Sequence, residues 1–374
     1  MEKVAVTIIG AGVVGLAIAA ELAKTNDSVF VLEKEDTYGT GASSRNSEVV
    51  HAGIYYPPGS LKALLCIEGN RMLVELCQNN NISYKKTGKY IVATSDDELL
   101  ALENLWQNAK DCGLETLVYK TEAALKKVEP QVSARGALYS PSTAVINAHE
   151  LMDYLYQRSR ESGVEYAFGV EPLSIEETLD GYLVQIQDAD NEVFEFVSEI
   201  VINAAGLSAD EIAEMAGIDI DKAGYRLHYC KGDYFIVHGE QRKLIKHLVY
   251  PVPQPKIKGL GIHVTLDVAG NMHLGPDAEY ISRDDLAYDV SDSKRQDFLS
   301  SVNKFFPALD IASIAPERSG IRPKLQGPGD EVRDFVIREE ADKGLPGFIN
   351  LIGIESPGLT ASLAIAKYVE GLLS

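Results

Sequence analysis

The sequence contains four cysteines in 374 residues, at Cys66, Cys77, Cys112 and Cys230. No two of them form a CxxC pair, and none has the spacing of a zinc site. We therefore expect neither a redox dithiol nor a bound metal. Reduced, buried thiols in a reducing compartment are the expectation for such cysteines.

Basic residues are scarce relative to acidic ones. Lys and Arg number 35 against 55 Asp and Glu, which gives a formal net charge of -20. Such a chain repels the phosphate backbone, so no nucleic-acid partner is expected. It also disfavours an anionic membrane surface. A small anionic substrate remains compatible with this charge, because a few buried cations can set a local field against the global one.

Long apolar runs are absent as well, so no stable membrane insertion is expected. The first residues lead directly into the strand-like sequence VAVTIIG, without the pattern of a secretory signal. We therefore expect a cytoplasmic protein. The oligomeric state stays open at this stage.

What the sequence does contain is a strand, a turn and a helix at each end. The patterns predict strands at 4–9 and 28–33, and a strand at 347–352 that precedes a closing helix. Further strand patterns cluster after residue 180. We expect an α/β fold with a three-layer, Rossmann-like nucleotide-binding domain and an inserted, mainly antiparallel β-sheet substrate (cap) domain. The expected nucleotide-binding domain is discontinuous, with segments 1–85, 146–225 and 323–374, and the expected substrate domain comprises 86–145 and 226–322.

A GxGxxG motif occupies the first turn, with Gly10, Gly12 and Gly15 around Val14. In such a motif the first glycine permits a tight turn, the second lets the backbone approach a pyrophosphate, and the third allows close helix packing. Glu33 ends the second strand, where a carboxylate accepts hydrogen bonds from ribose hydroxyls and disfavours a 2'-phosphate. The plain alternative is an ordinary βαβ unit with a solvated Glu33.

The segments that follow distinguish FAD from NAD. The loop Thr40–Gly53 is rich in hydroxyl and amide donors, which suits a long cofactor that extends past the first helix. At the other end, Gly353–Thr360 precedes the last helix, whose N-terminus can stabilise negative charge on a reduced flavin. Alternatively, these are a polar surface loop and an ordinary helix cap. With the motif above, they predict FAD as the cofactor.

These pieces together resemble the D-amino-acid-oxidase-type superfamily of FAD enzymes. Within it, the chain is similar to the L-2-hydroxyglutarate dehydrogenase/oxidase family across nearly its whole length. The motifs that carry this similarity are Asn46–Tyr56, Ser60–Ala63, Lys231–Tyr234, Tyr250–Pro253, Gly261–Thr265 and Leu274–Pro276.

The chain departs from that family in two places. The region 280–315 is shorter than in the membrane-associated members, which puts membrane docking and quinone reduction in doubt. Around Arg322 the sequence also resembles glycerol-3-phosphate dehydrogenases. The resemblance further implies cofactor contacts at Val170 and in the segment Asn203–Asp210. The complete set of expected cofactor-binding residues is Gly10, Gly12, Val14, Gly15, Glu33, Lys34, Ser43, Ser44, Arg45, Asn46, Ser47, Val170, Ala205, Gly206, Gly353, Pro357, Gly358, Leu359 and Thr360.

Oxidation of a 2-hydroxy acid needs a neutral base near the hydroxyl group, and histidine is the natural choice. His263 is the first candidate, since the family places its strand facing the flavin, and His51 in the flavin-side loop is the second. For either residue the plain alternative is a packed or surface histidine. Whether FAD is covalently attached through His51 stays open.

A carboxylate substrate also needs cationic or phenolic donors. We expect Arg322 to form a bidentate pair with the substrate carboxylate, whereas a surface ion pair is its plain alternative. Tyr56 and Tyr250 are expected supporting donors, and Lys231 is a possible second cation. Since Tyr55 and Tyr56 are adjacent, only one of the two is expected to reach the substrate.

The sequence therefore predicts an FAD-dependent oxidoreductase that oxidises a small anionic 2-hydroxy acid, L-2-hydroxyglutarate, to the 2-oxo acid. Electrons pass to oxygen or to a diffusible, quinone-like acceptor. The alternatives are another FAD enzyme of the superfamily (an amino-acid or glycine oxidase, or a glycerol-3-phosphate dehydrogenase), a flavin-binding protein without turnover, and an NAD-dependent dehydrogenase.

Overall fold

The computed structural model describes residues 2–253 and 261–373, and the chain forms two compact units. The first unit comprises Met1–Ser44, Ala148–Tyr229 and Pro323–Ser374, and the second comprises Arg45–Asn147 and Cys230–Arg322. The expected domains follow the same discontinuous pattern, but residues 45–85 pack with the second unit rather than with the first. The binding roles expected of the two domains stay predictions.

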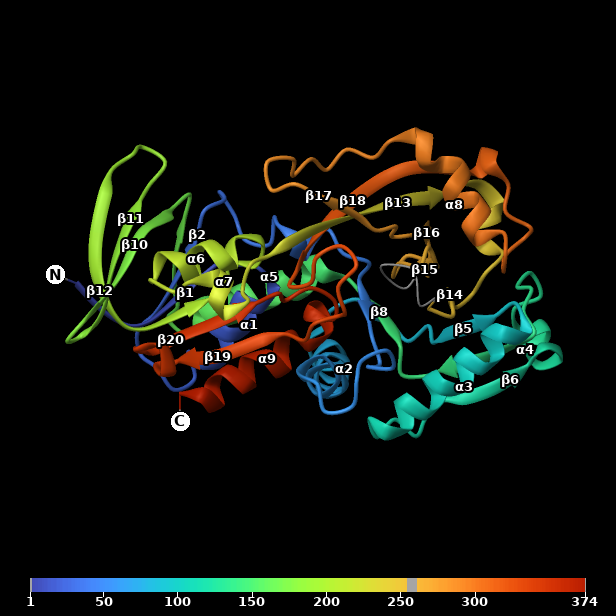
Figure 1. The fold of residues 1–374 in the computed structure, drawn as a ribbon, viewed down its shortest axis with the longest axis horizontal. Helices are drawn as coiled ribbons and strands as arrows, with labels where there is room; N and C mark the ends of the chain where they lie inside the picture. Colours follow the sequence, from blue (N-terminus) through green and yellow to red (C-terminus); the bar gives the residue numbers. More distant parts are fainter. Residues whose placement is uncertain (1, 254–260, 374) are drawn as a thin grey trace. The chain divides into compact units, whose positions relative to one another are not determined.

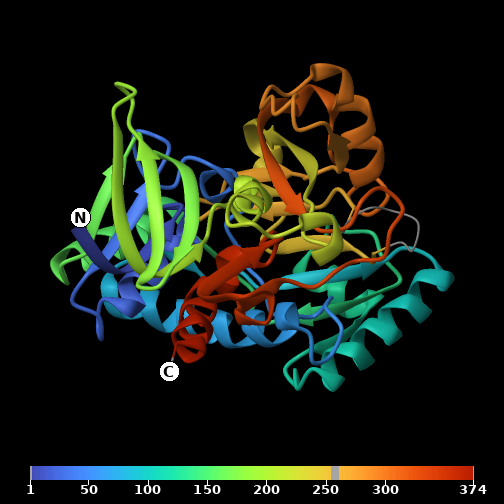
Figure 2. The ribbon, with the colours of Figure 1, turned by 60° about the vertical axis from the view of Figure 1, so that its left-hand side comes forward.

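A parallel sheet forms the centre of the first unit (Figure 1), with the strand order β20-β12-β1-β2-β9. Its bounds are β1 (Glu2–Ile9), β2 (Val29–Glu33), β9 (Glu165–Phe168), β12 (Val193–Asn203) and β20 (Leu345–Ile352). Antiparallel strands extend it: β10 (Glu171–Thr178) and β11 (Gly181–Gln187) continue from β12, and β19 (Val336–Glu340) pairs with β20. Figure 2 shows β10, β11 and β12 as long neighbouring strands.

Helix α1 (Val13–Leu22) packs against both α5 (Ala148–Glu161) and the closing helix α9 (Gly358–Leu372). Its sequence, VVGLAIAAEL, is apolar almost all around, as expected for a helix that is covered on several sides. The first unit also contains the short helices α6 (Ala209–Met215) and α7 (Ile220–Ala223). The closing strand and helix therefore pack beside the opening ones, although they lie at opposite ends of the chain.

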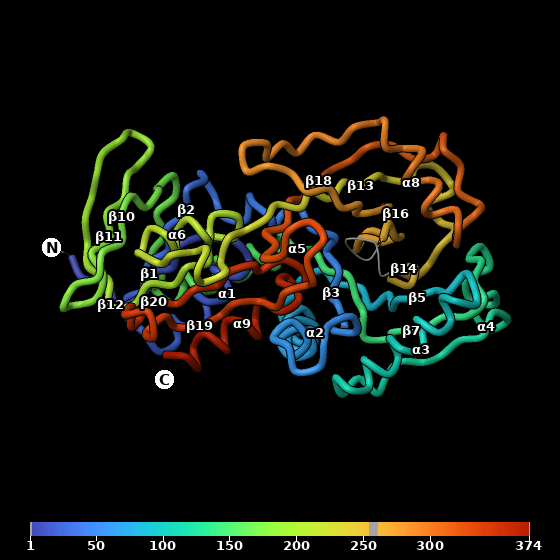
Figure 3. Tube along the Cα trace, in the orientation of Figure 1, coloured from blue at the N-terminus to red at the C-terminus, as the bar shows by residue number. Residues whose placement is uncertain are grey.

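The second unit contains a mainly antiparallel sheet with the strand order β17-β13-β16-β15-β14-β5-β7-β6, and β18 pairs with β13. Strands β5 and β14 are parallel neighbours, which can be followed in Figure 3. The bounds are β5 (Lys89–Ala93), β6 (Val118–Thr121), β7 (Gly136–Ser140), β13 (His228–Val237), β14 (Leu248–Pro251), β15 (Val264–Leu266), β16 (Met272–Leu274), β17 (Glu279–Ile281) and β18 (Ile314–Lys324). Strands β13 and β18 also run into the first unit at one end.

Helices and a small second sheet complete this unit. The helices are α2 (Leu61–Asn80), α3 (Asp96–Asp111), α4 (Glu122–Val128) and α8 (Arg295–Val302). The small sheet has the order β3-β8-β4, with β3 (Val49–Val50), β4 (Tyr84–Lys85) and β8 (Ala144–Ile146). In the main core, Phe298 of α8 packs against Phe235 of β13, with ring centroids 4.5 Å apart.

Candidate functional site

The segments predicted to bind the cofactor meet at one edge of the first unit's sheet. Ile9 pairs with Leu32 on one side and with Asn203 on the other. Asn203 in turn pairs with Asn350, and Glu33 pairs with Phe168. Because all of these strands are parallel, the loops after them leave from the same carboxyl edge. In open α/β sheets, ligands bind at this edge, beside the point where the strand order reverses.

The glycine turn after β1 depends on its missing side chains. Gly10 has φ +105°, and a Cβ there would lie 2.6 Å from the carbonyl oxygen of Ala204. A Cβ on Gly15 would overlap the carbonyl oxygen of Gly10. Gly10 and Gly15 therefore serve the close packing of β1, β12 and α1, as expected, while Gly12 is the N-cap of α1.

The N-termini of α1 and α9 are suited to hold negative charge. Neither helix has a side-chain hydrogen bond from its N-cap residue, Gly12 or Pro357, and neither has an acidic residue in its first turn. By contrast, Ser60 caps α2 and Ser95 caps α3 through their side chains. The first turns of α1 and α9 thus add no negative charge of their own, which fits a pyrophosphate at α1 and an electron-rich flavin ring at α9.

The carboxylate of Glu33, at the end of β2, bonds to the turn between β1 and α1. One oxygen accepts a hydrogen bond from the Ala11 amide at 2.8 Å, and the other accepts one from the Glu35 amide at 3.1 Å. Each oxygen keeps a further lone pair for ribose hydroxyls, so these bonds hold the acid in place for its expected role. The amide of Val170 donates to the Glu33 carbonyl at 3.0 Å, which places Val170 beside the same strand end. Lys34 is exposed.

The Ser43 hydroxyl accepts a hydrogen bond from the Val13 amide at 2.9 Å, so it lies at the N-terminus of α1. Val14 follows in the same first turn. Ser44 bonds to the carbonyl of Thr40 at 3.1 Å within its own loop. This hydrogen bond places the Ser43 side chain at the end of α1 where a pyrophosphate is expected, and its cofactor role stays a prediction.

The remaining predicted cofactor segments end β12 and β20. The Ala205 amide donates to the Asn203 side chain at 3.3 Å, and Gly206 has φ +59°. Gly353 has φ +72°, and a Cβ there would lie 2.6 Å from the Leu325 side chain. Beyond it, Pro357, Gly358, Leu359 and Thr360 form the start of α9.

An ion pair holds the closing loop in the first unit. Lys324 Nζ lies 2.9 Å from Glu355 Oε2, and the side chains are 10% and 6% exposed. This pair joins the end of β18 to the loop that precedes α9.

Three predicted cofactor residues, Arg45, Asn46 and Ser47, belong to the second unit. The Arg45 guanidinium lies 4.0 Å from the centroid of the Tyr288 ring. The Asn46 side chain accepts from the Glu48 amide at 2.7 Å, and Ser47 hydrogen-bonds to Tyr234. Their contacts therefore shape the loop, and their cofactor roles stay predictions.

The second unit holds a buried cluster around His263. Its Nδ1 lies 2.7 Å from the Gly261 carbonyl oxygen. A carbonyl only accepts, so Nδ1 carries the proton and Nε2 is left with a lone pair. The imidazole stacks on the Tyr250 ring with centroids 3.7 Å apart. Burial, followed by the charges of Lys89 and Arg322, lowers the pKa of His263 to about 3. The imidazole is therefore neutral near pH 7, as a base must be.

His51 belongs to the same cluster. Burial, with the charges of Lys89 and His263, lowers its pKa to about 3. Among the described residues, the phenol oxygens of Tyr55 and Tyr250 are buried without a hydrogen-bond partner. Burial raises the pKa of both phenols well above the usual value. Both hydroxyls thus keep their protons and can donate them to an anionic ligand.

The ring contacts place Tyr55, the neighbour of the expected Tyr56, in this cluster. Lys89 Nζ lies 4.6 Å from the centroids of both Tyr55 and Tyr250. The carbonyl of Tyr56 accepts from the Asn108 side chain at 2.9 Å, which ties that residue to α3. The prediction of Tyr56 as a substrate donor stays untested.

Sequence reasoning missed Lys89. It is 1% exposed and opens β5, a strand that is buried throughout. The only signal in the sequence is a charged residue at the start of the apolar run Tyr90–Ala93, and such a lysine usually lies at a strand end in solvent. Burial lowers the pKa of Lys89 to about 7.

The two predicted cations differ in their contacts. Arg322 donates from Nη2 to the Asp277 carbonyl at 2.7 Å and from Nε to the Cys230 carbonyl at 3.4 Å. Its charge contributes to the lowered pKa of His263, so Arg322 lies within electrostatic reach of the cluster. Lys231 instead donates to the Asp289 carbonyl at 2.6 Å and lies 3.9 Å from the Asp233 carboxylate. Lys231 is therefore already compensated.

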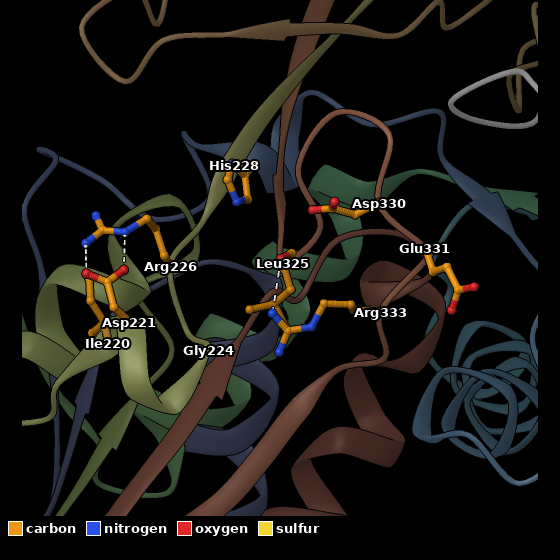
Figure 4. A pocket seen from close by; sticks show the side chains of 9 residues that line it. All are labelled: Ile220, Asp221, Gly224, Arg226, His228, Leu325, Asp330, Glu331 and Arg333. Atoms are coloured by element: carbon orange, nitrogen blue, oxygen red, sulfur yellow. Dashed lines mark hydrogen bonds and ion pairs between the residues drawn. The ribbon is translucent and has the colours of Figure 1, made fainter.

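The first unit also contains a pocket of about 410 Å³ (Figure 4). Its lining residues are Ile220, Asp221, Gly224, Arg226, His228, Leu325, Asp330, Glu331 and Arg333. The guanidinium of Arg226 makes two 2.6 Å bonds to Asp221, and Arg333 donates to the Leu325 carbonyl at 3.2 Å, as the dashed lines in Figure 4 show. This pocket contains none of the residues predicted to bind FAD or substrate, and its arginines already have acceptors.

Within residues 2–253 and 261–373, no group of acidic, histidine and cysteine side chains has the arrangement of a metal site. In the same residues, no helix has the length and apolar character needed to cross a bilayer. The four cysteines are free thiols, and Cys66, Cys77 and Cys230 are buried.

Comparison with known proteins identifies the family. Residues 5–372 match the family described as "DAO: FAD dependent oxidoreductase". The mitochondrial L-2-hydroxyglutarate dehydrogenase of Arabidopsis thaliana is 36% identical, over 98% of this chain and 83% of that protein. A glycerol 3-phosphate dehydrogenase of Caloramator mitchellensis is 32% identical, over 98% of this chain and 73% of that protein.

A solved structure resembles the whole chain. The L-alpha-glycerophosphate oxidase of Mycoplasma pneumoniae with FAD bound has a TM-score of 0.88 at 26% identity, covering 100% of this chain and 95% of that one. These matches confirm the expected fold class, the family resemblance and the choice of FAD over NAD. The chain belongs to the family of FAD dependent oxidoreductases, and FAD is its cofactor.

Proposed function

We propose that this enzyme oxidises the CH–OH group of L-2-hydroxyglutarate to give 2-oxoglutarate. The observation that carries the proposal is the cluster of the second unit, in which a neutral imidazole lies within electrostatic reach of Arg322 and Lys89. A base and cationic groups for carboxylates are what a 2-hydroxy acid requires. The L-2-hydroxyglutarate dehydrogenases among the relatives, from 27% to 36% identical, support this choice of substrate.

In this proposal His263 accepts the hydroxyl proton at Nε2, the nitrogen that its bond to Gly261 leaves unprotonated. Arg322 holds the carboxylate next to the reacting carbon, because two backbone carbonyls already orient its guanidinium. The phenols of Tyr55 and Tyr250 donate hydrogen bonds to the bound anion. A substrate carboxylate near His263 raises the pKa of the imidazole toward the working pH, which strengthens the base once the substrate is bound. His51 is the second candidate for this role.

Bound FAD supplies the oxidising chemistry by accepting the hydride from the substrate Cα at N5. The residues that would hold it in the first unit are the Gly10–Gly15 turn, Glu33 and Ser43. The start of α9 would stabilise negative charge on its ring. The electrons then pass to oxygen or to a diffusible, quinone-like acceptor. This acceptor and the cytoplasmic location stay predictions.

The test is to mix the purified flavoprotein with L-2-hydroxyglutarate without oxygen and to record the absorption band of the oxidised flavin. We expect the band to bleach and 2-oxoglutarate to form in equal amount. D-2-hydroxyglutarate is the matched control and should leave the band unchanged. If L-2-hydroxyglutarate does not bleach the flavin while another hydroxy or amino acid does, the substrate proposal is wrong.

Glycerol 3-phosphate is a second candidate substrate. The Caloramator relative and the fold of the Mycoplasma oxidase, with its TM-score of 0.88, favour it. A phosphate group would use the same cations in place of carboxylates. The anaerobic experiment with glycerol 3-phosphate decides between the two, since the true substrate bleaches the flavin at micromolar to millimolar concentration.

A further inference from the structure

The ammonium group of Lys89 is buried, and residues 2–253 and 261–373 place no carboxylate in an ion pair with it. No ion pair among the described residues involves it, and its close contacts are the faces of the Tyr55 and Tyr250 rings. Cation–π contacts stabilise an ammonium only partly, and they do not replace a carboxylate in a site that excludes water. Burial, which disfavours the charged ammonium, lowers the pKa of Lys89 to about 7. A buried lysine with this environment is a candidate for binding an anionic ligand.

Strand register directs this lysine toward the substrate cluster. Lys89 pairs with Leu248, and Ile91 pairs with Tyr250, in the parallel strands β5 and β14. Since alternate residues of a strand share a face, Lys89 and Tyr250 point to the same side as diagonal neighbours. Tyr250 in turn stacks on His263. Lys89 and the candidate base His263 therefore both contact the ring of Tyr250.

Two cations without a carboxylate partner act on the same imidazole. Both Lys89 and Arg322 lower the pKa of His263 by their charge, and among the described residues the hydrogen bonds of Arg322 lead only to backbone carbonyls. A monocarboxylate would neutralise one of these cations and leave the other buried and uncompensated. A dicarboxylate would neutralise both. The charge arrangement thus favours a substrate with two anionic groups around one reacting hydroxyl.

We propose that Lys89 is a specificity-determining residue, which binds the second carboxylate of a dicarboxylic 2-hydroxy acid while Arg322 binds the first. This inference rests on the proposed oxidation of a 2-hydroxy acid and deepens it. It replaces Lys231 as the second cation, because the Lys231 ammonium already lies 3.9 Å from the Asp233 carboxylate, whereas Arg322 bonds only to backbone carbonyls among the described residues.

Binding of unreactive acids to the FAD-loaded enzyme tests this role without turnover. Glutarate and pentanoate share a five-carbon chain and differ by one carboxylate. We expect Lys89→Met to weaken glutarate binding relative to pentanoate binding about 100-fold, the size typical of a lost buried charge pair. Lys89→Arg should retain most of the preference for glutarate. Calorimetric titration, or the ligand-induced shift of the flavin spectrum, measures each dissociation constant.

Two further variants serve as controls. Lys86→Met removes an exposed lysine three positions earlier and should change neither dissociation constant. Lys231→Met removes the cation that sequence reasoning favoured. If Lys231→Met abolishes the preference for glutarate and Lys89→Met does not, or if Lys89→Met weakens both acids equally, the assignment of Lys89 is wrong.

Turnover separates a failure of this inference from a failure of the proposed function. L-2-hydroxyglutarate and L-2-hydroxypentanoate are the matched reactive pair. We expect Lys89→Met to lower the ratio of kcat/KM for the diacid to kcat/KM for the monoacid about 100-fold. A wild-type enzyme that oxidises neither acid would contradict the proposed function. A wild-type enzyme that prefers the diacid, and keeps that preference after Lys89→Met, would contradict only the role of Lys89.

The pH dependence of glutarate binding gives a third readout. His51 and His263 have pKa values near 3, and burial raises the pKa of Cys66 to about 12 and that of Tyr55 and Tyr250 well above the usual value. Between pH 5 and 9, Lys89 is thus the member of this group that titrates, and it loses its charge as the pH rises through about 7. Glutarate affinity should fall above this pH in the wild type, whereas the Lys89→Met enzyme should show no such fall. A fall that persists in the variant would contradict the role of Lys89.

Discussion

The carboxyl edge of the first unit's sheet and the cluster around His263 in the second unit are built in different ways. At the sheet edge, each binding element is a loop of a few residues between a strand and a helix, and its backbone amides and helix ends carry the function. The cluster instead combines single side chains from the segment after β3, from β5, from β14 and from the residue just before β15. A local motif can be recognised in the sequence, whereas a cluster of distant side chains depends on strand pairing.

The largest expected effect concerns the local motif. Gly15→Val should abolish FAD binding, because even a Cβ at this position overlaps the Gly10 carbonyl and forces α1 away from β1. We expect the purified variant to be colourless, with FAD affinity reduced more than about 100-fold. Gly371→Ala is the matched control in a helix, since a Cβ there meets nothing within 4 Å. A Gly15→Val protein that is purified with bound FAD, and is therefore yellow, would show that a side chain at this position does not prevent FAD binding.

Removal of the candidate base, His263, tests whether the cluster acts in the reaction. His263→Ala should slow flavin reduction by L-2-hydroxyglutarate about 10²–10⁴-fold, the range for a positioned acid–base group, while FAD stays bound. Stopped-flow reduction under anaerobic conditions measures the rate. The exposed His238 provides the control His238→Ala, which should reduce at the wild-type rate. Unchanged kinetics in His263→Ala would remove this histidine from the mechanism.

A buried ion pair allows a stability test of the first unit. Lys324→Met removes the cation paired with the Glu355 carboxylate, which is 6% exposed, and should lower the free energy of unfolding by about 3–5 kcal/mol. Lys3→Met breaks an exposed pair with Asp180 and should cost less than about 1 kcal/mol. Denaturant-induced unfolding of the FAD-loaded proteins compares the two variants. Equal losses would indicate that burial of the Lys324–Glu355 pair contributes nothing.

A lower pH should reduce the stability of the folded protein through protonation of His263 in the unfolded chain. The folded protein keeps His263 neutral down to a pKa of about 3, whereas the unfolded chain protonates it below the ordinary histidine pKa of 6.5. The unfolded state therefore binds more protons between these values, and the stability due to this histidine is lost as the pH falls. Between pH 7 and pH 5 we expect a loss of about 2 kcal/mol from His263.

The variant His263→Gln isolates this contribution. Between pH 7 and pH 5 the free energy of unfolding should fall less in the variant than in the wild type. The difference between the two decreases should equal the contribution of His263. Denaturant titrations at the two pH values provide the comparison. If the pH dependence of the variant equals that of the wild type, the imidazole is not held neutral by the fold.

The smallest expected effect concerns a phenol of the cluster. Tyr250→Phe removes a buried hydroxyl that has no partner among the described residues, and it keeps the ring that stacks on His263. We expect KM for the substrate to rise about 10-fold, the loss of roughly one hydrogen bond to a charged group, with little change in protein stability. Steady-state kinetics and thermal unfolding check both parts. A variant with wild-type KM would show that the hydroxyl does not contact the substrate.

Sequence reasoning described the elements with strong local patterns accurately. The opening turn, Glu33 and the closing helix all lie where the pattern places them. It described irregular strands less well: strand β18 spans Ile314–Lys324 but contains Pro316, Gly320 and Pro323, which hide its pattern. Strand β15 begins at Val264, so His263 lies just before the strand rather than in its middle.

The sequence by itself determined the cofactor and the family of this protein, because a dinucleotide site is made by backbone turns whose glycine and acidic residues are adjacent or nearly so. Tertiary structure alone decided which side chains face the candidate base. Tyr55 joins the cluster, Lys231 is neutralised by its neighbours, and Lys89 becomes a buried cation beside Tyr250. The register of β5 against β14 sets that last contact, and the free energy of a charge depends on the groups that surround it after folding.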